Sequence, residues 1–131
     1  MREIKFRMYS KKKKVMHYWD HIKQFQMAAL DDNDENEKYS PWMQYTGLED
    51  TKNGREIYEE DIIQTSYMKI RGCAYRCVFS AEFGGYLFDP FVIGDKDAPL
   101  LGIEEFAQEW EEVKHGEVIG NIYENPKLLS N

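Results

Sequence analysis

Residues 43–65, MQYTGLEDTKNGREIYEEDIIQT, contain the strand and turn signals that decide the fold. A short strand rich in Trp, Met and Tyr is predicted over 42–45, and it ends at a Thr-Gly pair. Asn53 and Gly54 form the pair that most readily supplies positive φ at both central positions of a tight turn. Residues 57–65 then lead from a turn into a second strand. The stretch therefore predicts β structure on both sides of a long polar turn.

Three later segments also have the composition of short strands: 74–79, 82–88 and 117–123. Within the second of these, Gly84 and Gly85 permit a bulge or a sharp bend. Short strands at nearly regular spacing, with turn residues between them, favour a small barrel or sandwich. We therefore expect a mainly β (α+β) chain.

One amphipathic helix is predicted over 103–113, immediately before the last strand. Apolar residues recur there at spacings of three and four, while glutamate and glutamine occupy the opposite face. The apolar positions are Ile103, Phe106, Ala107, Trp110 and Val113.

The N-terminal residues predict a β-hairpin. Over 2–8 apolar and charged side chains alternate, which places Ile4 on the buried side of a strand and Arg7 on the other side. The lysine run at 11–14 is expected to form the turn, and residues 15–19 the returning strand.

Between this hairpin and the first barrel strand the signals are weaker. Asp20 is a candidate cap for a short helix with apolar positions at Ile22, Phe25 and Ala29, and an irregular segment is the alternative. The acidic run 31–37 cannot contribute to a core, so it predicts an exposed loop.

Length and composition favour one core with a small subdomain. The chain has 131 residues, and its hydrophobic content of 42% excludes wholesale disorder. We expect an N-terminal hairpin subdomain with its acidic loop over 1–40 and a barrel over 41–131.

The sequence predicts a cytoplasmic protein with no membrane association. No apolar run approaches the roughly 18 residues that cross a bilayer, and residues 1–10 lack the apolar stretch of a signal peptide. Cys73 and Cys77 are too few for a multi-bridge secreted scaffold, which agrees with a reducing compartment.

The net charge of −7 is unevenly distributed. The first fourteen residues carry seven basic side chains and one acidic one, so the remaining 117 residues carry −13. An acidic body repels a phosphate backbone, which disfavours nucleic acid as a general partner. The exception is the run Lys11, Lys12, Lys13 and Lys14, which is either a contact patch for phosphate or an acidic partner, or a solvated hairpin tip.

Three blocks of the chain resemble the YopX family of small bacteriophage and prophage proteins. They are MREIKFRMYS at 1–10, MQYTGLEDTKNGREIYEEDII at 43–63 and EVIGNIYENPKLL at 117–129. The resemblance implies an α+β N-terminal part followed by an SH3-like β-barrel, and a phage or prophage origin. The family has no established activity, so no catalytic residue can be assigned from it. Family members commonly have glycine at the position of Glu60, and we therefore expect a less strained backbone here than in relatives.

No residue pattern predicts catalysis, a cofactor or a metal. Cys73 and Cys77 are four apart rather than three, and they are expected to be packed thiols. His17 and His21 are also four apart, but the segment has the composition of a strand and no metalloprotease glutamate follows. The cluster at 59–61, Glu-Glu-Asp, is interpreted as surface charge rather than paired catalytic carboxylates.

Four tyrosines are candidates for an exposed aromatic groove that binds a peptide or a single strand: Tyr45, Tyr58, Tyr75 and Tyr86. The alternative is that these rings fill the core, since a domain of this size needs aromatic side chains there.

The leading hypothesis is a non-enzymatic phage accessory protein whose barrel surface binds a host or phage macromolecule, and the favoured partner is an unidentified host or phage protein. One alternative is a nucleic-acid-binding protein that uses the basic N-terminal hairpin. Another is a structural protein that self-assembles into a homo-oligomer through edge strands. A third is an enzyme, for which a deep pocket with converging carboxylates would be required.

Overall fold

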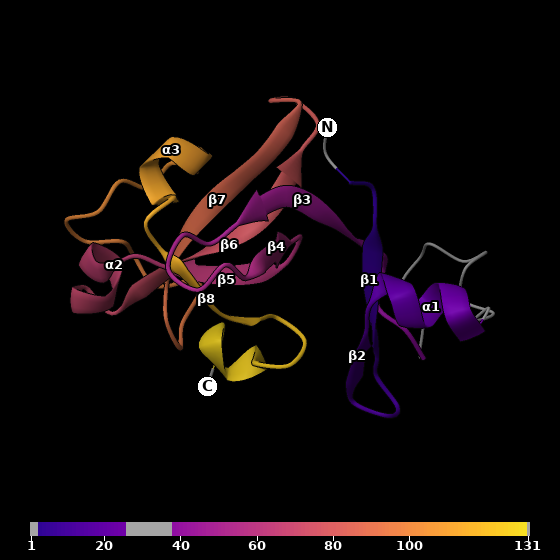
Figure 1. Ribbon diagram of the computed structural model, residues 1–131. Helices are drawn as coiled ribbons and strands as arrows, with labels where there is room; N and C mark the ends of the chain where they lie inside the picture. Colours follow the sequence, from indigo (N-terminus) through magenta and orange to yellow (C-terminus); the bar gives the residue numbers. More distant parts are fainter. Residues whose placement is uncertain (1–2, 26–37, 131) are drawn as a thin grey trace.

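The computed structural model describes residues 3–25 and 38–130, and these form two antiparallel sheets of four strands each (Figure 1). The first sheet has the order β2-β1-β3-β4 and the second has the order β7-β6-β5-β8. The strands of the first sheet are β1 (Phe6–Ser10), β2 (Val15–His17), β3 (Met43–Glu49) and β4 (Glu56–Tyr58). Those of the second are β5 (Asp61–Gln64), β6 (Cys73–Ser80), β7 (Gly85–Val92) and β8 (Glu117–Asn121).

The helices are short and lie at the ends of strands. They are α1 (Trp19–Phe25), α2 (Ser66–Ile70), α3 (Trp110–Val113) and the 3-10 turn η2 (Pro126–Leu128). In Figure 1, β1, β2 and α1 lie at one end of the molecule, and α2 lies with α3 at the other.

The main core is lined by the second sheet, which curls into a half-barrel, and by Ile57 of β4. Alternate side chains of its strands point inward, and α2 and α3 each add one buried residue, Met68 and Val113. Two smaller clusters lie outside it. One is centred on Met8 and Ile22 beside α1, and the other on Ile62, Ala74 and Phe91 beneath the C-terminal segment.

The prediction of a mainly β chain with an N-terminal hairpin is confirmed. Strands β1 and β2 pair in the register Met8 with His17 and Ser10 with Val15. Strand β1 also pairs with β3, through Phe6 with Gln44, so the first sheet continues across residue 40. The division at residues 40 and 41, and the SH3-like character of the barrel, stay predictions. Ala29 and the acidic run 31–37 lie outside the described residues.

The predicted helix over 103–113 is wrong for most of its length. Only Trp110–Val113 is helical, because Gln108 exchanges two backbone hydrogen bonds of 2.8 Å with Phe88 at the edge of β7. A backbone bonded to a strand in this way cannot continue a helical ladder. Ile103 packs against the core from a loop, whereas Phe106 is 78% exposed, so the helical spacing of these apolar residues is coincidental.

The Asn53-Gly54 turn is also built differently from the prediction. Gly54 has a φ of +67°, whereas Asn53 is not among the residues with positive φ. The Asp50 carboxylate accepts hydrogen bonds from the backbone N–H groups of Asn53 and Arg55, at 2.7 and 3.2 Å. Hydrogen bonds to the Asp50 carboxylate therefore stabilise the turn, and Asn53 does not adopt the left-handed conformation that the prediction required.

The expectation of a relaxed backbone at Glu60 is wrong. Glu60 has a φ of +71°, in the left-handed region that favours glycine. Its N–H donates to Cys77 O at 2.8 Å, and its carbonyl accepts from Ile122 N at 3.2 Å. Its carboxylate also binds the Arg76 guanidinium. The hydrogen bonds of its N–H and carbonyl groups hold Glu60 at positive φ, although this backbone conformation is strained for a residue other than glycine.

Glycine at position 60 should therefore be more stable than alanine. Glu60→Gly and Glu60→Ala both remove the ion pair with Arg76, but only Gly adopts positive φ without strain. We expect Glu60→Gly to exceed Glu60→Ala in free energy of unfolding by about 1 kcal/mol. Urea denaturation of the two variants measures this difference. Equal stabilities would show that the left-handed backbone carries no strain.

Candidate functional site

The predicted basic patch lies at the turn between β1 and β2. Lys12, Lys13 and Lys14 are exposed there, and Lys11 is partly buried. The turn is closed by Ser10, whose backbone oxygen accepts from Lys14 N at 2.7 Å. Lys14 itself has a φ of +58°. Lys12 to Lys14 are therefore exposed to solvent at the end of the hairpin. A contact patch and a solvated hairpin tip both require this exposure.

The four candidate tyrosines do not form one exposed face. Tyr45, Tyr58 and Tyr75 are between 2 and 8% exposed. The rings of Tyr45 and Tyr58 pack on each other at a centroid distance of 5.4 Å. Tyr86 is partly buried, and its hydroxyl donates to Gln44 Oε1 at 3.1 Å. The structure therefore favours the interpretation of core aromatics for three of the four.

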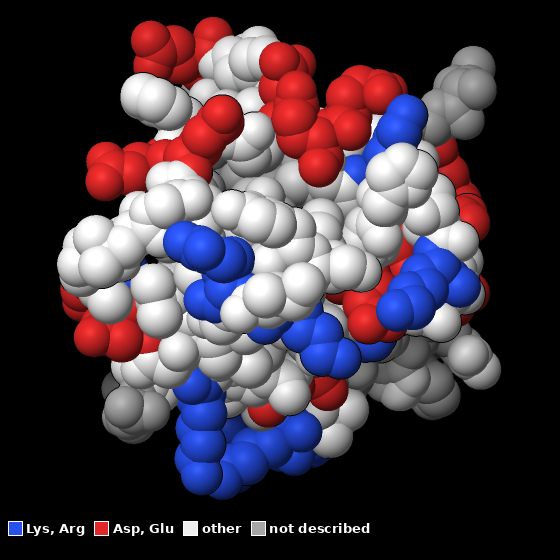
Figure 2. Space-filling model, turned by 90° about the vertical axis from the view of Figure 1, so that its left-hand side faces the viewer, with Lys and Arg blue, Asp and Glu red and all other residues white. Residues whose placement is uncertain are grey.

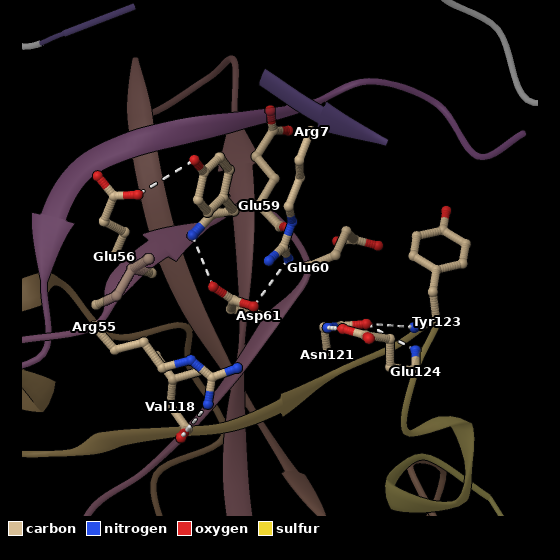
Figure 3. A network of polar contacts seen from close by, with 12 residues as sticks. Arg7, Arg55, Glu56, Glu59, Glu60, Asp61, Val118, Asn121, Tyr123 and Glu124 are labelled. Atoms are coloured by element: carbon tan, nitrogen blue, oxygen red, sulfur yellow. Dashed lines mark hydrogen bonds and ion pairs between the residues drawn. The ribbon is translucent and has the colours of Figure 1, made fainter. Parts of the chain in front are cut away.

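A buried ion pair joins β1 to the start of β5, where the sequence predicted only surface charge. Arg7 and Asp61 are 2% and 1% exposed, and Arg7 Nη2 donates to Asp61 Oδ1 at 2.9 Å. Figure 3 shows this contact between Arg7 and Asp61. The guanidinium also lies over the Tyr58 ring, 4.6 Å from its centroid. The second oxygen of Asp61 accepts from Tyr58 N at 2.8 Å. The prediction of a solvent-facing Arg7 is wrong because neighbouring segments enclose it, and Ile4, expected to be buried, is 66% exposed.

Each carboxylate of the 59–61 cluster is used in a structural contact. Glu59 Oε1 accepts from Gln44 N at 2.7 Å, Glu60 pairs with Arg76, and Asp61 pairs with Arg7. Burial raises the pKa of Glu59, and it also raises the pKa of Asp61 against the opposing charge of Arg7. The three carboxylates bind partners on three different strands. Glu59 and Asp61 bind β3 and β1 of the first sheet, and Glu60 binds β6 of the second, so residues 59–61 link the two sheets.

The cysteines and the His17–His21 pair are the remaining candidates for reactive groups. Cys73 and Cys77 are buried free thiols, and burial raises the pKa of both, which disfavours the nucleophilic thiolate. The His17 and His21 rings stack at 4.9 Å, and burial lowers the pKa of His17. Within the described residues, no three potential ligand side chains of the His, Cys, Asp and Glu types gather to hold a metal ion.

Exposed large apolar side chains occur on α2 and on the segment 99–109, whose backbone runs beside α2 in Figure 1. Tyr67 Oη donates to Gly102 O at 3.3 Å, and Arg71 Nη2 donates to Leu101 O at 2.8 Å, so this segment is held against the helix. Only one residue of α2, Met68, is buried. We define the α2 face as four side chains that are 54 to 83% exposed: Tyr67, Ile70, Leu101 and Phe106.

A hollow that contains the Glu104 carboxylate borders α2 at Tyr67. It has a volume of about 340 Å³ and is lined by Tyr67, Tyr75, Ile103, Glu104 and Gln108. Further carboxylates follow along the same segment and α3. This acidic flank consists of Glu104, Glu105, Glu109, Glu111 and Glu112, all of them exposed.

A second hollow borders α2 at Ser66, Lys69 and Ile70 and has a volume of about 240 Å³. Four titratable side chains line it: Lys52, Lys69, His115 and Glu117. We call the first three the basic flank; Glu117 lies 3.5 Å from Lys52 and offsets its charge. In Figure 2, acidic side chains gather along one edge of this side of the molecule, while basic ones lie across its middle and opposite edge.

Sequence reasoning missed the α2 face because residues 66–72 received no assignment. The signal was present: Thr65 caps the helix by accepting from Met68 N at 3.2 Å, and Gly72 follows it with a φ of +70°. A capping residue before and a left-handed glycine after are typical of a short helix. With that helix placed, Tyr67 and Ile70 fall three residues apart on one side of it.

A family model and a solved structure are similar to this chain. The family model described as YopX protein matches residues 5–130. The crystal structure of protein EF1440 from Enterococcus faecalis has a TM-score of 0.56 and 23% identity, over 99% of this chain and 100% of that one. At this identity the likeness supports the fold alone. A search of curated proteins found no match. In the described residues, no helix has both the length and the apolar character needed to cross a membrane.

Proposed function

The chain belongs to the YopX protein family, and from this premise we propose that it is a phage- or prophage-encoded accessory protein that binds another protein and catalyses no reaction. The proposal places it in the cytoplasm of the bacterial host, where its partner is a host or phage protein. The α2 face is the observation that carries the proposal.

The large apolar side chains of the α2 face are costly to leave in water. Ile70, Leu101 and Phe106 are each more than three quarters exposed, and full burial of one such side chain contributes about 1.5–3 kcal/mol. Clustered exposed apolar groups with a charged rim are typical of protein-binding surfaces. The acidic and basic flanks provide such a rim.

The contacts of the reactive side chains support a binding role over a catalytic one. The carboxylates of residues 59–61 hold backbone and guanidinium groups, and both thiols are buried with raised pKa values. A general acid, a general base or a nucleophile must reach its substrate. These groups are instead used to hold the fold together.

Substituting the α2 face should abolish capture of the partner. Ile70→Ser combined with Leu101→Ser removes two exposed side chains, so stability is expected to change little. We expect the affinity for the partner to fall by about 100-fold or more, because both contacts lose their apolar burial. Capture from induced host lysate, with and without nuclease, followed by quantitative mass spectrometry, is the measurement.

The control changes two half-exposed aromatic residues elsewhere. Phe79→Ser with Phe83→Ser alters the hairpin between β6 and β7, where these side chains are 53% and 52% exposed. Proteins that the control retains and the α2-face variant loses are candidate partners. If both variants capture the same proteins as the wild type, the α2 face does not bind them.

A second candidate function, nucleic-acid binding, is favoured by the exposed lysines at the β1–β2 turn. Phosphate contacts there should release counterions, so affinity should fall steeply with salt. Reversal of Lys11 to Lys14 to glutamate should remove such binding while leaving capture through the α2 face unchanged. A fluorescence titration with labelled single-stranded and duplex DNA separates the two candidates.

A further inference from the structure

The Asn53-Gly54 pair is chemically reactive as well as suited to a turn. It is the one Asn-Gly pair in the sequence, since the other asparagines precede Asp, Glu, Ile or Pro or end the chain. The backbone nitrogen after an asparagine is able to attack its side-chain amide, and glycine hinders this attack least because it has no Cβ. Both residues are exposed, so water reaches them. Asn53 is therefore the asparagine of this chain best placed to lose its amide.

The reaction is deamidation, and its co-reactant is water. The Gly54 nitrogen forms a bond to Asn53 Cγ, the bond from Cγ to Nδ2 breaks, and ammonia leaves with the proton that the Gly54 nitrogen gives up. Water then opens the succinimide ring at either carbonyl and yields aspartate or isoaspartate. No group is oxidised or reduced. Position 53 gains a carboxylate, and in isoaspartate the main chain also gains a methylene group.

In the folded chain, both reacting groups are engaged in hydrogen bonds. Gly54 N donates to Asp50 O at 2.9 Å, and Asn53 Nδ2 donates to Glu117 Oε2 at 3.2 Å. Succinimide formation removes the proton from the Gly54 nitrogen and detaches Nδ2 from Asn53. It is therefore incompatible with both hydrogen bonds, which must break before the ring forms.

The turn that contains the pair is also docked on β8 and on the residues before it. Asp50 Oδ2 accepts from Val118 N at 3.0 Å, and Thr51 Oγ1 donates to Lys114 O at 2.8 Å. Movement of the turn away from β8 is the step that releases both residues of the pair. A reaction that proceeds only from such an open form follows the population of that form.

We propose that Asn53 is a deamidation site whose reaction is controlled by the docking of the 50–55 turn on β8. While the turn is docked, Glu117 and the Asp50 carbonyl hold the reacting groups, and the reaction is slow. When the turn opens, Asn53 deamidates. The new carboxylate then faces Glu117 in place of an amide that donated to it, and this like charge opposes renewed docking. One opening event thereby becomes a lasting change in the turn.

The test follows the conversion of Asn53 in the full-length protein at mildly alkaline pH. Peptide mass spectrometry detects the exchange of the amide for a carboxyl group, and enzymatic methylation measures isoaspartate. We expect the folded wild type to react at least about tenfold more slowly than the same protein unfolded in guanidinium chloride, because the open turn is a minor form. Equal rates in the two states would overturn control by docking. No product at position 53 in the unfolded chain would overturn the site itself.

Glu117→Ala tests the contact with the amide. It should accelerate deamidation of the folded protein roughly two- to fivefold, the factor that one hydrogen bond of ordinary strength is worth. Glu117→Gln keeps an acceptor oxygen and should return the rate close to that of the wild type. Lys52→Ala is the matched control, because it removes the cation that lies 3.5 Å from Glu117 and leaves the amide contact in place. If Glu117→Ala reacts no faster than Lys52→Ala, Glu117 does not protect Asn53.

Global stability decides whether the reactive form is the open turn. We expect Glu117→Ala to keep the urea midpoint of the wild type, since the side chain is 31% exposed. A rate increase matched by an equal loss of unfolding free energy would show that the reaction proceeds from the unfolded chain, and the inference would fall. Asn53→Asp reproduces one product and should have a lower urea midpoint than Asn53→Ala, which removes the donor without adding charge. Equal midpoints would show that the product does not oppose docking.

Discussion

Replacing Asp61 by alanine should lower the free energy of unfolding by about 3–5 kcal/mol. The variant leaves the Arg7 guanidinium buried without its counterion, since Arg7 is 2% exposed and 2.9 Å from the Asp61 carboxylate. The Tyr58 N–H loses its acceptor as well. A buried charge without a partner costs far more than the intact pair contributes. Urea denaturation of the two proteins at neutral pH measures the loss.

The size of this effect depends on the environment of Arg7 as well as on one contact. Arg7 Nη2 also donates to Glu59 O at 3.2 Å, and the guanidinium lies over the Tyr58 ring. Within the described residues, Arg7 Nε has no hydrogen-bond partner. The folded state therefore already carries one incompletely satisfied cation. This is why loss of Asp61 should be severe.

A double-mutant cycle separates the pair from the packing around it. Arg7→Met with Asp61→Leu replaces both charges by apolar side chains, and we expect it to be more stable than either single variant of this cycle, Arg7→Met or Asp61→Leu. Arg7→Lys is the matched control, because it keeps the charge but loses the planar group that stacks on Tyr58. If the double variant loses as much free energy of unfolding as the two single variants together, Arg7 and Asp61 are not energetically coupled.

The strands could be predicted from sequence because their signals are local. Residues 74–79, for example, have the composition of a short strand, and the structure forms β6 at Cys73–Ser80. The 103–113 prediction failed for the opposite reason. The backbone of Gln108 is bonded to Phe88, twenty residues away along the chain, and no local pattern encodes that pairing. Periodicity describes which residues are apolar but not which strand edge the backbone will meet.

The candidate binding surfaces could be predicted only in part. The exposed lysines at 11–14 follow from composition and the hairpin, whereas the α2 face depends on two segments that meet only in three dimensions. Leu101 lies beside α2 because Arg71 binds its carbonyl, 30 residues away in sequence. The buried Arg7–Asp61 pair has the same origin, since 54 residues separate its members. Contacts between residues distant in sequence therefore bury charged side chains that the local pattern predicts to lie on the surface.

Asp50 should make the protein sensitive to acid. The carboxylate is 1% exposed and joins the 50–55 turn to β8, because Oδ2 accepts from Val118 N at 3.0 Å. Burial opposes its ionisation, but hydrogen bonds from the backbone N–H groups of Val118, Asn53 and Arg55 outweigh burial and lower the pKa of Asp50 below its ordinary value of 3.8. A carboxyl whose pKa is lower in the folded state stabilises the fold above the unfolded pKa. Its contribution is lost as the pH falls through the folded pKa.

Asp50→Asn should therefore cost about 3 kcal/mol at neutral pH, because the amide cannot accept all three hydrogen bonds and leaves a buried N–H of β8 without an acceptor. The difference in unfolding free energy between wild type and variant should be constant from pH 7 to about pH 5 and shrink below about pH 4, as Asp50 becomes protonated in the wild type. Urea denaturation across this range gives the difference curve. Glu111→Gln is a matched control, since its carboxylate also has a lowered pKa but lies exposed beside Lys114. A pH-independent difference for Asp50→Asn would show that neutral hydrogen bonds, rather than the ionised carboxylate, hold the turn to β8.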